Sequence, residues 1–194
     1  NGAHGLPYHY EMVSDTRRVA PFKKAINLVC KGKTVLESGT GTGILGLLAA
    51  RAGAKKVYTV EIDSAVAKFA LRNIRRSQYR NVEFIQKNIL DVSLVDIEDQ
   101  RADVVIAENL STWQVTEPQI KVLNHVNANL AKENAVRLPT RIINYVELAE
   151  SNYLFEKMVE IRAQFFQFSG IQSPKILSRK TLFQAIDLRK INPT

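Results

Sequence analysis

Short apolar runs alternate with amphipathic stretches along most of the chain. The runs at 34–38, 57–61, 82–85 and 102–107 predict strands, and the run at 102–107 is almost wholly apolar, which is typical of a strand in a sheet covered on both faces. Apolar residues with helical spacing predict helices at 16–29, 44–52, 64 to about 78 and about 117 to 132. The alternation predicts an α/β fold with a mostly parallel sheet and helices on both faces.

The pattern changes at Pro139 and becomes rich in strand signals. Beyond it lie two predicted strands and one stretch that is ambiguous between a helix and a strand: 142–147, 182–188 and 153–162, respectively. We therefore expect one domain over residues 1–138 and a small, partial β-rich second domain over residues 139–194.

The first predicted strand runs into a glycine-rich turn and then into a helix. Gly39, Gly41 and Gly43 let the main chain turn tightly, and without a Cβ a ligand can lie directly against the backbone. An ordinary strand-to-helix connection that binds nothing is the alternative. The dinucleotide fingerprint requires its third glycine at the position of Ile44, so a pyrophosphate ligand is disfavoured.

Two acidic residues next to this turn indicate which ligand it binds. Glu37 lies just before the turn, where a carboxylate repels phosphate but suits the α-ammonium group of S-adenosylmethionine. Glu61 ends the second predicted strand and is placed to accept hydrogen bonds from two ribose hydroxyls. The glycine turn does not end in the Gly-Lys-Ser/Thr of a P-loop, because Gly43 is followed by Ile44 and Leu45. We therefore predict a Rossmann-like domain that binds S-adenosylmethionine rather than NAD or ATP.

Composition is compatible with a small enzyme. Of the 194 residues 45% are hydrophobic, which supports a packed core, and no apolar run approaches the roughly 20 residues of a membrane span. The single cysteine, Cys30, cannot form an internal disulfide and fits a reducing compartment. No signal peptide is visible. We predict a cytoplasmic protein with no membrane partner and no metal site.

The chain is basic, with a formal net charge of +8 and a pI near 9.6, which would help an acidic partner approach. Its Lys and Arg residues are spread along the sequence, without the interleaved aromatic side chains that a stacking platform for nucleic acid requires. RNA is therefore a permitted partner that the sequence does not specifically indicate.

A second stretch with chemical information follows the fourth predicted strand. Glu108 ends that strand and should face the same crevice as the glycine turn, because ligands of open α/β sheets bind at the carboxyl ends of the strands. Glu117 could return across a loop to face it, which would give two carboxylates able to hold a planar guanidinium. Alternatively, Glu117 is only a favourable charge in the first turn of a helix.

The chain resembles the protein arginine methyltransferase family over most of its length. The segment 9–18, His-Tyr-Glu-Met-Val-Ser-Asp-Thr-Arg-Arg, is similar to the family's E-M-x-x-D-x-x-R motif. The stretches 35–45 and 50–58 and the acidic Glu61 match its cofactor motifs, and Glu108 and Glu117 have the spacing of its two glutamates. The residues 173–177 and 183–188 are similar to the start of its C-terminal β-barrel.

The resemblance implies roles for individual residues. Arg18 would contact the cofactor carboxylate, and Asn88 and Ile89 would read the adenine edge. Met12 would line the methyl-transfer region, while Trp113 either covers the pocket or anchors the loop. The full set expected at the cofactor is Arg18, Glu37, Gly39, Thr40, Gly41, Gly43, Glu61, Ile62, Asn88 and Ile89. Glu108 and Glu117 are the expected catalytic residues.

The chain also departs from this family. After its first glutamate the family usually has Trp-Met-Gly-Tyr, whereas residues 109–112 are Asn-Leu-Ser-Thr, and the family's Thr-His-Trp loop has no counterpart here. We therefore expect a minimal or truncated member with an open substrate side. A homo-oligomer is a possible assembly, although the family's dimerisation arm has no obvious match.

The expected activity is transfer of a methyl group from S-adenosylmethionine to a nitrogen of a protein or peptide, with an arginine-like guanidinium held by Glu108 and Glu117. Two alternatives stay open: an RNA methyltransferase, which the basic charge and the altered loop favour, and a cofactor-binding protein with no turnover of its own.

Overall fold

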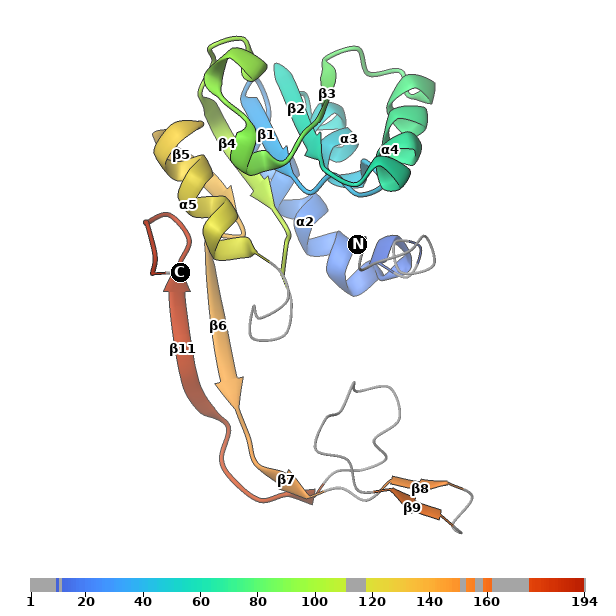
Figure 1. Cartoon of the computed structure of the whole chain (residues 1–194), viewed down its shortest axis with the longest axis vertical. Helices are drawn as coiled ribbons and strands as arrows, with labels where there is room; N and C mark the ends of the chain where they lie inside the picture. The colour runs from blue at the N-terminus through green and yellow to red at the C-terminus, as the bar shows by residue number, and fades with distance from the viewer. Residues whose placement is uncertain are drawn as a thin grey trace. The chain divides into compact units, whose positions relative to one another are not determined.

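The computed structural model describes residues 10, 12–110, 118–150, 153–155, 159–161 and 175–193, with the backbone alone at 150, 153–155 and 159–161. The chain forms two compact units, one of residues 1–141 together with 187–194 and the other of residues 142–186 (Figure 1). The predicted domain boundary at residue 138 stays a prediction, because a compact unit is not by itself an independently folding domain.

The first unit is built on a parallel sheet. Among the described residues five strands form it, in the order β3-β2-β1-β4-β5, and every neighbouring pair is parallel. They are β1 (Thr34–Ser38), β2 (Lys56–Glu61), β3 (Val82–Gln86), β4 (Ala102–Ala107) and β5 (Ala131–Leu138). All five residues of the central β1 are buried, including the polar Thr34, Glu37 and Ser38, as expected for a strand covered on both faces. The predicted Rossmann-like α/β fold is confirmed.

Helices connect these strands and cover the sheet. They are α2 (Thr16–Val29), α3 (Ile44–Arg51), α4 (Ser64–Arg76) and α5 (Gln119–Asn129), with short 3-10 turns η1 (Ile89–Asp91) and η2 (Leu94–Ile97). Asp15 and Asp63 cap α2 and α4 by accepting hydrogen bonds from the first backbone amides of each helix. The core contains Ile26 of α2, Leu48 of α3 and Val104 of β4. None of the described helices is long and apolar enough to cross a membrane.

The helix predicted to reach residue 132 is wrong at its C-terminal end. Helix α5 stops at Asn129, and the next residues form β5, a strand that the sequence analysis missed. Half of the eight residues of β5, Ala-Lys-Glu-Asn-Ala-Val-Arg-Leu, are exposed, and β5 is the edge strand of the sheet. An edge strand need not be apolar on both faces, so its charged residues resemble a continuing helix.

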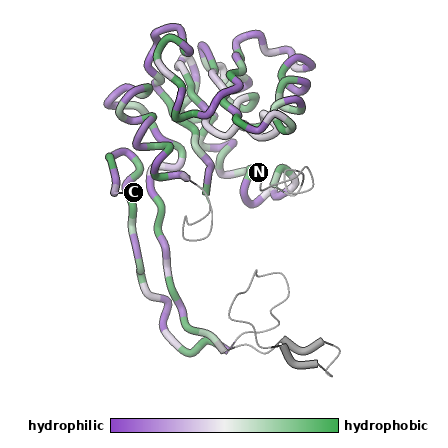
Figure 2. The backbone as a smooth tube through the Cα atoms, viewed as in Figure 1, coloured by the Kyte–Doolittle hydropathy of each residue, from purple (hydrophilic) through white to green (hydrophobic). Residues whose placement is uncertain are grey.

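The second unit is rich in strands. Strand β6 (Arg141–Val146) forms a two-stranded sheet with β11 (Thr181–Asp187), which confirms the two strands predicted there. The ambiguous stretch contains β8 (Tyr153–Phe155) and β9 (Val159–Ile161), an antiparallel pair. Strand β7 (Ala149–Glu150) pairs antiparallel with β10 (Lys175–Ile176). Figure 2 shows hydrophobic positions along β6 and β11, and large side chains such as Tyr145 and Phe183 are exposed.

The edge strand β5 is organised around one buried cation, Arg137. Its Nε donates to Asn127 Oδ1 at 3.0 Å, and its Nη atoms donate to the main-chain oxygens of Lys132 at 3.2 Å, of Glu133 at 3.1 Å and of Ala135. Arg137 is 4% exposed, and burial lowers the pKa of its guanidinium. The carbonyl groups of Lys132, Glu133 and Ala135 belong to an irregular stretch of β5. The Arg137 side chain therefore links the residues of this bulge.

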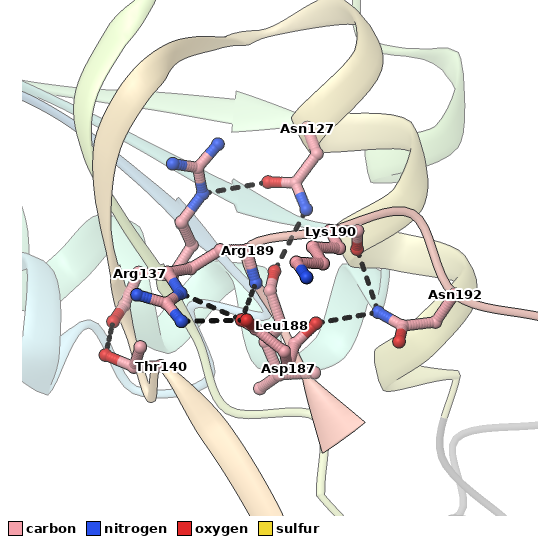
Figure 3. A network of polar contacts seen from close by, with 8 residues as sticks. All are labelled: Asn127, Arg137, Thr140, Asp187, Leu188, Arg189, Lys190 and Asn192. Atoms are coloured by element: carbon pink, nitrogen blue, oxygen red, sulfur yellow. Dashed lines mark hydrogen bonds and ion pairs between the residues drawn. The ribbon is translucent and has the colours of Figure 1, made fainter.

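The chain returns to this region after β11. Leu188 donates its backbone N–H to Thr140 O at 2.9 Å and accepts from Asn127 Nδ2 at 3.0 Å (Figure 3). Nearby, Arg189 pairs through two hydrogen bonds with the Asp187 carboxylate, at 2.9 and 2.8 Å. Asn127 therefore connects the buried Arg137 to the returning segment.

Arg137→Met should destabilise the protein by about 2–4 kcal/mol, because it removes charge-assisted hydrogen bonds and leaves several bulge carbonyls unsatisfied. Urea unfolding followed by circular dichroism measures this loss. Arg189→Met is the matched control: that side chain is 61% exposed, so its removal should have a much smaller effect. Equal losses for the two variants would contradict the role assigned to Arg137.

Candidate functional site

The glycine loop between β1 and α3 has the backbone that its sequence predicted. Gly39, Gly41 and Gly43 have φ values of +73°, +56° and +90°, in the left-handed region that favours glycine. The loop is anchored on β2, because the N–H groups of Gly39 and Thr40 both donate to Val60 O at 3.0 Å. A Cβ on Gly39 would lie 2.5 Å from Asn109 Nδ2. Glycine is thus required there by close approach as well as by φ.

Glu61 lies beside this loop at the carboxyl end of β2. One carboxylate oxygen accepts from Gly41 N at 2.9 Å and the other from Asp63 N at 2.9 Å, and the residue is 8% exposed. Each oxygen keeps a second lone pair, so the carboxylate could still accept a ribose hydroxyl. The predicted contact with ribose stays a prediction, and the loop-holding role of Glu61 is an addition to it.

Glu37 is more deeply buried than its sequence position suggested. It is 1% exposed; Oε1 accepts from Gly46 N of α3 at 3.1 Å, whereas Oε2 lacks a hydrogen-bond partner in the described part of the chain. A Cβ on Gly46 would lie 2.7 Å from Oε2, so the glycine makes room for the carboxyl group. Burial raises the pKa of Glu37 to about 8, although the hydrogen bond from Gly46 N acts in the opposite direction.

The predicted adenine-side residues follow β2 and β3 at the same edge of the sheet. Asn88 is the N-cap of η1, and its side chain accepts from Leu90 N at 3.1 Å. Ile89 is buried, whereas Ile62, next to Glu61, is 64% exposed. Since β2 and β3 are parallel neighbours, these residues lie on the side of the sheet where the glycine loop lies.

Arg18 and Glu108, which are 90 positions apart in sequence, form an ion pair between α2 and the end of β4. Their side chains are 25% and 15% exposed, respectively. Arg18 also donates to Met12 O at 3.2 Å, which brings the N-terminal segment to the same place. The structure thus joins the residue expected at the cofactor carboxylate to the one expected at the substrate.

Glu117 and Trp113 lie outside the described residues, so the two-carboxylate arrangement stays a prediction.

Two polar residues of this region were missed by the sequence analysis. Gln119, the first residue of α5, accepts from Asn109 N through Oε1 at 2.8 Å and donates from Nε2 to Ala107 O at 2.8 Å. Asn109 Oδ1 in turn accepts from Ser38 Oγ at 3.4 Å. A signal was present, because Gln119 shares the helical spacing of the buried Val122, Leu123 and Val126 and is therefore a polar residue on an apolar face.

Comparison with known proteins agrees with this architecture. Residues 30–159 match a family model described as a methyltransferase domain. An uncharacterized protein of Methanocaldococcus jannaschii is 35% identical over 188 residues, covering 96% of this chain and 67% of that protein. Protein arginine N-methyltransferase 7 of Drosophila virilis is 34% identical over 135 residues, covering 68% of this chain but only 19% of that enzyme.

Among solved structures, the Trypanosoma brucei PRMT1 enzyme-prozyme heterotetrameric complex with AdoHcy superposes with a TM-score of 0.79. It is 20% identical, and the match covers 97% of this chain and 64% of that one. At this identity the likeness concerns the fold, which includes the strands beyond the parallel sheet.

Glu37→Gln should change how stability depends on pH. A carboxyl with a folded-state pKa near 8 keeps its proton between about pH 5 and 8, whereas the unfolded chain, with an ordinary pKa near 4.5, releases it. The free energy of unfolding therefore falls as pH rises through this window. The stability that depends on a protonated Glu37 is lost once the pH passes the folded-state pKa near 8. The neutral Gln removes this dependence on pH, so the variant should match the wild type near pH 5 and exceed it by at least about 1 kcal/mol at pH 8.

Urea unfolding of the ligand-free protein from pH 5 to 8.5 measures this difference. Parallel curves for the wild type and Glu37→Gln across that range would contradict the buried neutral state of Glu37.

Proposed function

The chain belongs to the class I S-adenosylmethionine-dependent methyltransferases of the arginine-methyltransferase type, and from this premise we propose that it methylates arginine side chains of proteins or peptides. S-adenosylmethionine is its cofactor. The observation that favours arginine is the pairing of Glu108 with a guanidinium, that of Arg18, at the edge of the sheet where the glycine loop lies. This carboxylate can therefore be reached by the chemical group that the proposed substrate presents.

The residues at this edge fit the cofactor. The glycine loop has no Cβ at its three positions with positive φ, so a ligand can lie against its main chain. Glu61 accepts a hydrogen bond from Gly41 of the loop, and Glu37 of β1 is a buried carboxyl group. In the proposal Arg18 holds the cofactor carboxylate, Glu61 the ribose and the segment at Asn88 and Ile89 the adenine. Bound S-adenosylmethionine supplies a methyl group on a positively charged sulfonium.

The protein's main task in this reaction is positioning. The substrate guanidinium is always protonated, so Glu108, together with Glu117, would hold it and draw its positive charge toward one nitrogen. With the cofactor bound, the other nitrogen would take the methyl group, the electron pair of the S–CH3 bond would stay on sulfur, and the methylated nitrogen would then release a proton. Met12 would line the transfer region and Trp113 would cover it.

The setting of the reaction is also part of the proposal. The chain would act in the cytoplasm, which its single cysteine supports, and a homo-oligomer is the proposed assembly. The chain spans 67% and 19% of the two relatives described above, so the activity of a whole relative is not transferred to it as a fact.

Glu108→Gln should lower methyl transfer to an arginine-containing peptide by about 100-fold or more, since it removes the charge that orients the guanidinium. Cofactor affinity should change by less than about threefold, because the backbone loop, Glu61 and Arg18 itself are all retained, although Arg18 loses its ion-pair partner. Transfer of labelled methyl to the peptide and titration calorimetry with the cofactor measure the two quantities. Glu133→Gln, at an exposed position of β5, is the control and should behave as the wild type.

A peptide with lysine in place of arginine should accept no label. Equal transfer by Glu108→Gln and wild type would overturn the proposal. Label that the wild type delivers only to RNA, and that ribonuclease removes, would favour the RNA methyltransferase alternative instead.

A further inference from the structure

Gln119 forms hydrogen bonds with the main chain on both sides of Glu108. Its Nε2 donates to Ala107 O and its Oε1 accepts from Asn109 N, both at 2.8 Å. One carboxamide thus satisfies the carbonyl before Glu108 and the amide after it, as a neighbouring strand would. Glu108 lies between Ala107 and Asn109, so these two hydrogen bonds fix the main chain from which its side chain projects.

The Gln119 side chain is itself held in place by burial. Gln119 is 0% exposed, and it begins α5, whose Val122, Leu123 and Val126 are also buried. Buried polar groups are strongly destabilising when they lose their partners, so this carboxamide has little freedom to turn away from the main chain. A packed helix rather than a loop therefore supports the position of Glu108.

Asn109 extends the same arrangement to the cofactor loop. Its side chain accepts from Ser38 Oγ at 3.4 Å, and its Nδ2 lies 2.5 Å from where a Cβ on Gly39 would be. The main chain that carries Glu108 is thereby packed against the loop that follows β1. A shift of Glu108 relative to the loop would break one of these contacts.

We propose that Gln119 is a positioning residue that aims the Glu108 carboxylate at the substrate guanidinium. This inference rests on the proposed function, because it assigns Glu108 to substrate binding. It adds a residue of α5 that touches neither cofactor nor substrate and acts only through the main chain. A misplacement of about 1 Å at a reacting group can lower the rate about 100-fold, which is the scale on which such a residue matters.

Helix α5 offers a matched control. Asn124, which is partly buried, also makes two main-chain hydrogen bonds through its carboxamide, both to one residue: its Nδ2 donates to Asn192 O at 2.7 Å and its Oδ1 accepts from Asn192 N at 2.9 Å. This contact fastens the returning segment and involves no residue of the site. Gln119→Met and Asn124→Leu each remove one carboxamide and two hydrogen bonds, and both replacements are of similar size to the original side chain.

The first measurement compares kcat, KM and cofactor affinity for these two variants. Gln119→Met should lower kcat for an arginine peptide about 10- to 100-fold with cofactor affinity changed less than about threefold. Asn124→Leu should lose comparable thermal stability but keep kcat within about twofold. Gln119→Asn keeps the carboxamide but shortens the side chain by one methylene, so it should fall between wild type and Gln119→Met and serves if the latter fails to fold. Wild-type kcat in both Gln119 variants, or equal loss in Asn124→Leu, would overturn the proposal.

A second measurement does not depend on turnover. The coupling between Arg18→Met and Glu108→Gln in unfolding experiments reports how well Glu108 meets its partner. This coupling should fall by at least half in the Gln119→Met background and stay unchanged in Asn124→Leu. An unchanged coupling overturns the positioning role. A reduced coupling in a protein whose wild type transfers no methyl to arginine supports the positioning role and refutes only the proposed function.

Discussion

The parallel pairing of β1 with β2 on one side and β4 on the other decides where the candidate site lies. Ser38, the last residue of β1, is level with Val60 of β2 and with Ala107 of β4. The next residues of the three strands, the glycine loop, Glu61 and Glu108, must therefore emerge at the same edge of the sheet. Helix α2 then brings Arg18 to this edge, where it meets Glu108.

Three acidic residues near this edge are accommodated in three different ways. Glu37 is buried with a raised pKa, Glu61 is held by two backbone amides, and Glu108 is paired with Arg18. Negative charge suits the proposed reaction, because a sulfonium and a guanidinium repel each other when they are brought together. The Glu108 carboxylate would offset part of this repulsion, whereas Glu37, which keeps its proton near neutral pH, adds no negative charge.

The edge strand β5 shows a different kind of support. Its exposed face is charged, and the strand is held by contacts of the buried Arg137 and of the segment that returns after β11 with Asn127. Helix α5 connects the two regions: Asn127 contacts Arg137 and the returning chain, while Gln119 at its other end grips the main chain around Glu108. The same helix thus fastens the sheet edge and positions a residue of the site.

The sequence alone determined the α/β class, four of the five strands of the parallel sheet and the cofactor, because these depend on local patterns: apolar runs, left-handed glycines and acids at strand ends. It did not identify β5, since a charged edge strand and an exposed helix have similar local patterns. Only the tertiary structure decided that Arg18 meets Glu108 and that Gln119 supports it, as these contacts join segments 90 and about 10 positions apart through the packing of helices on the sheet. Such pairings follow from three-dimensional proximity, which no spacing in the chain encodes.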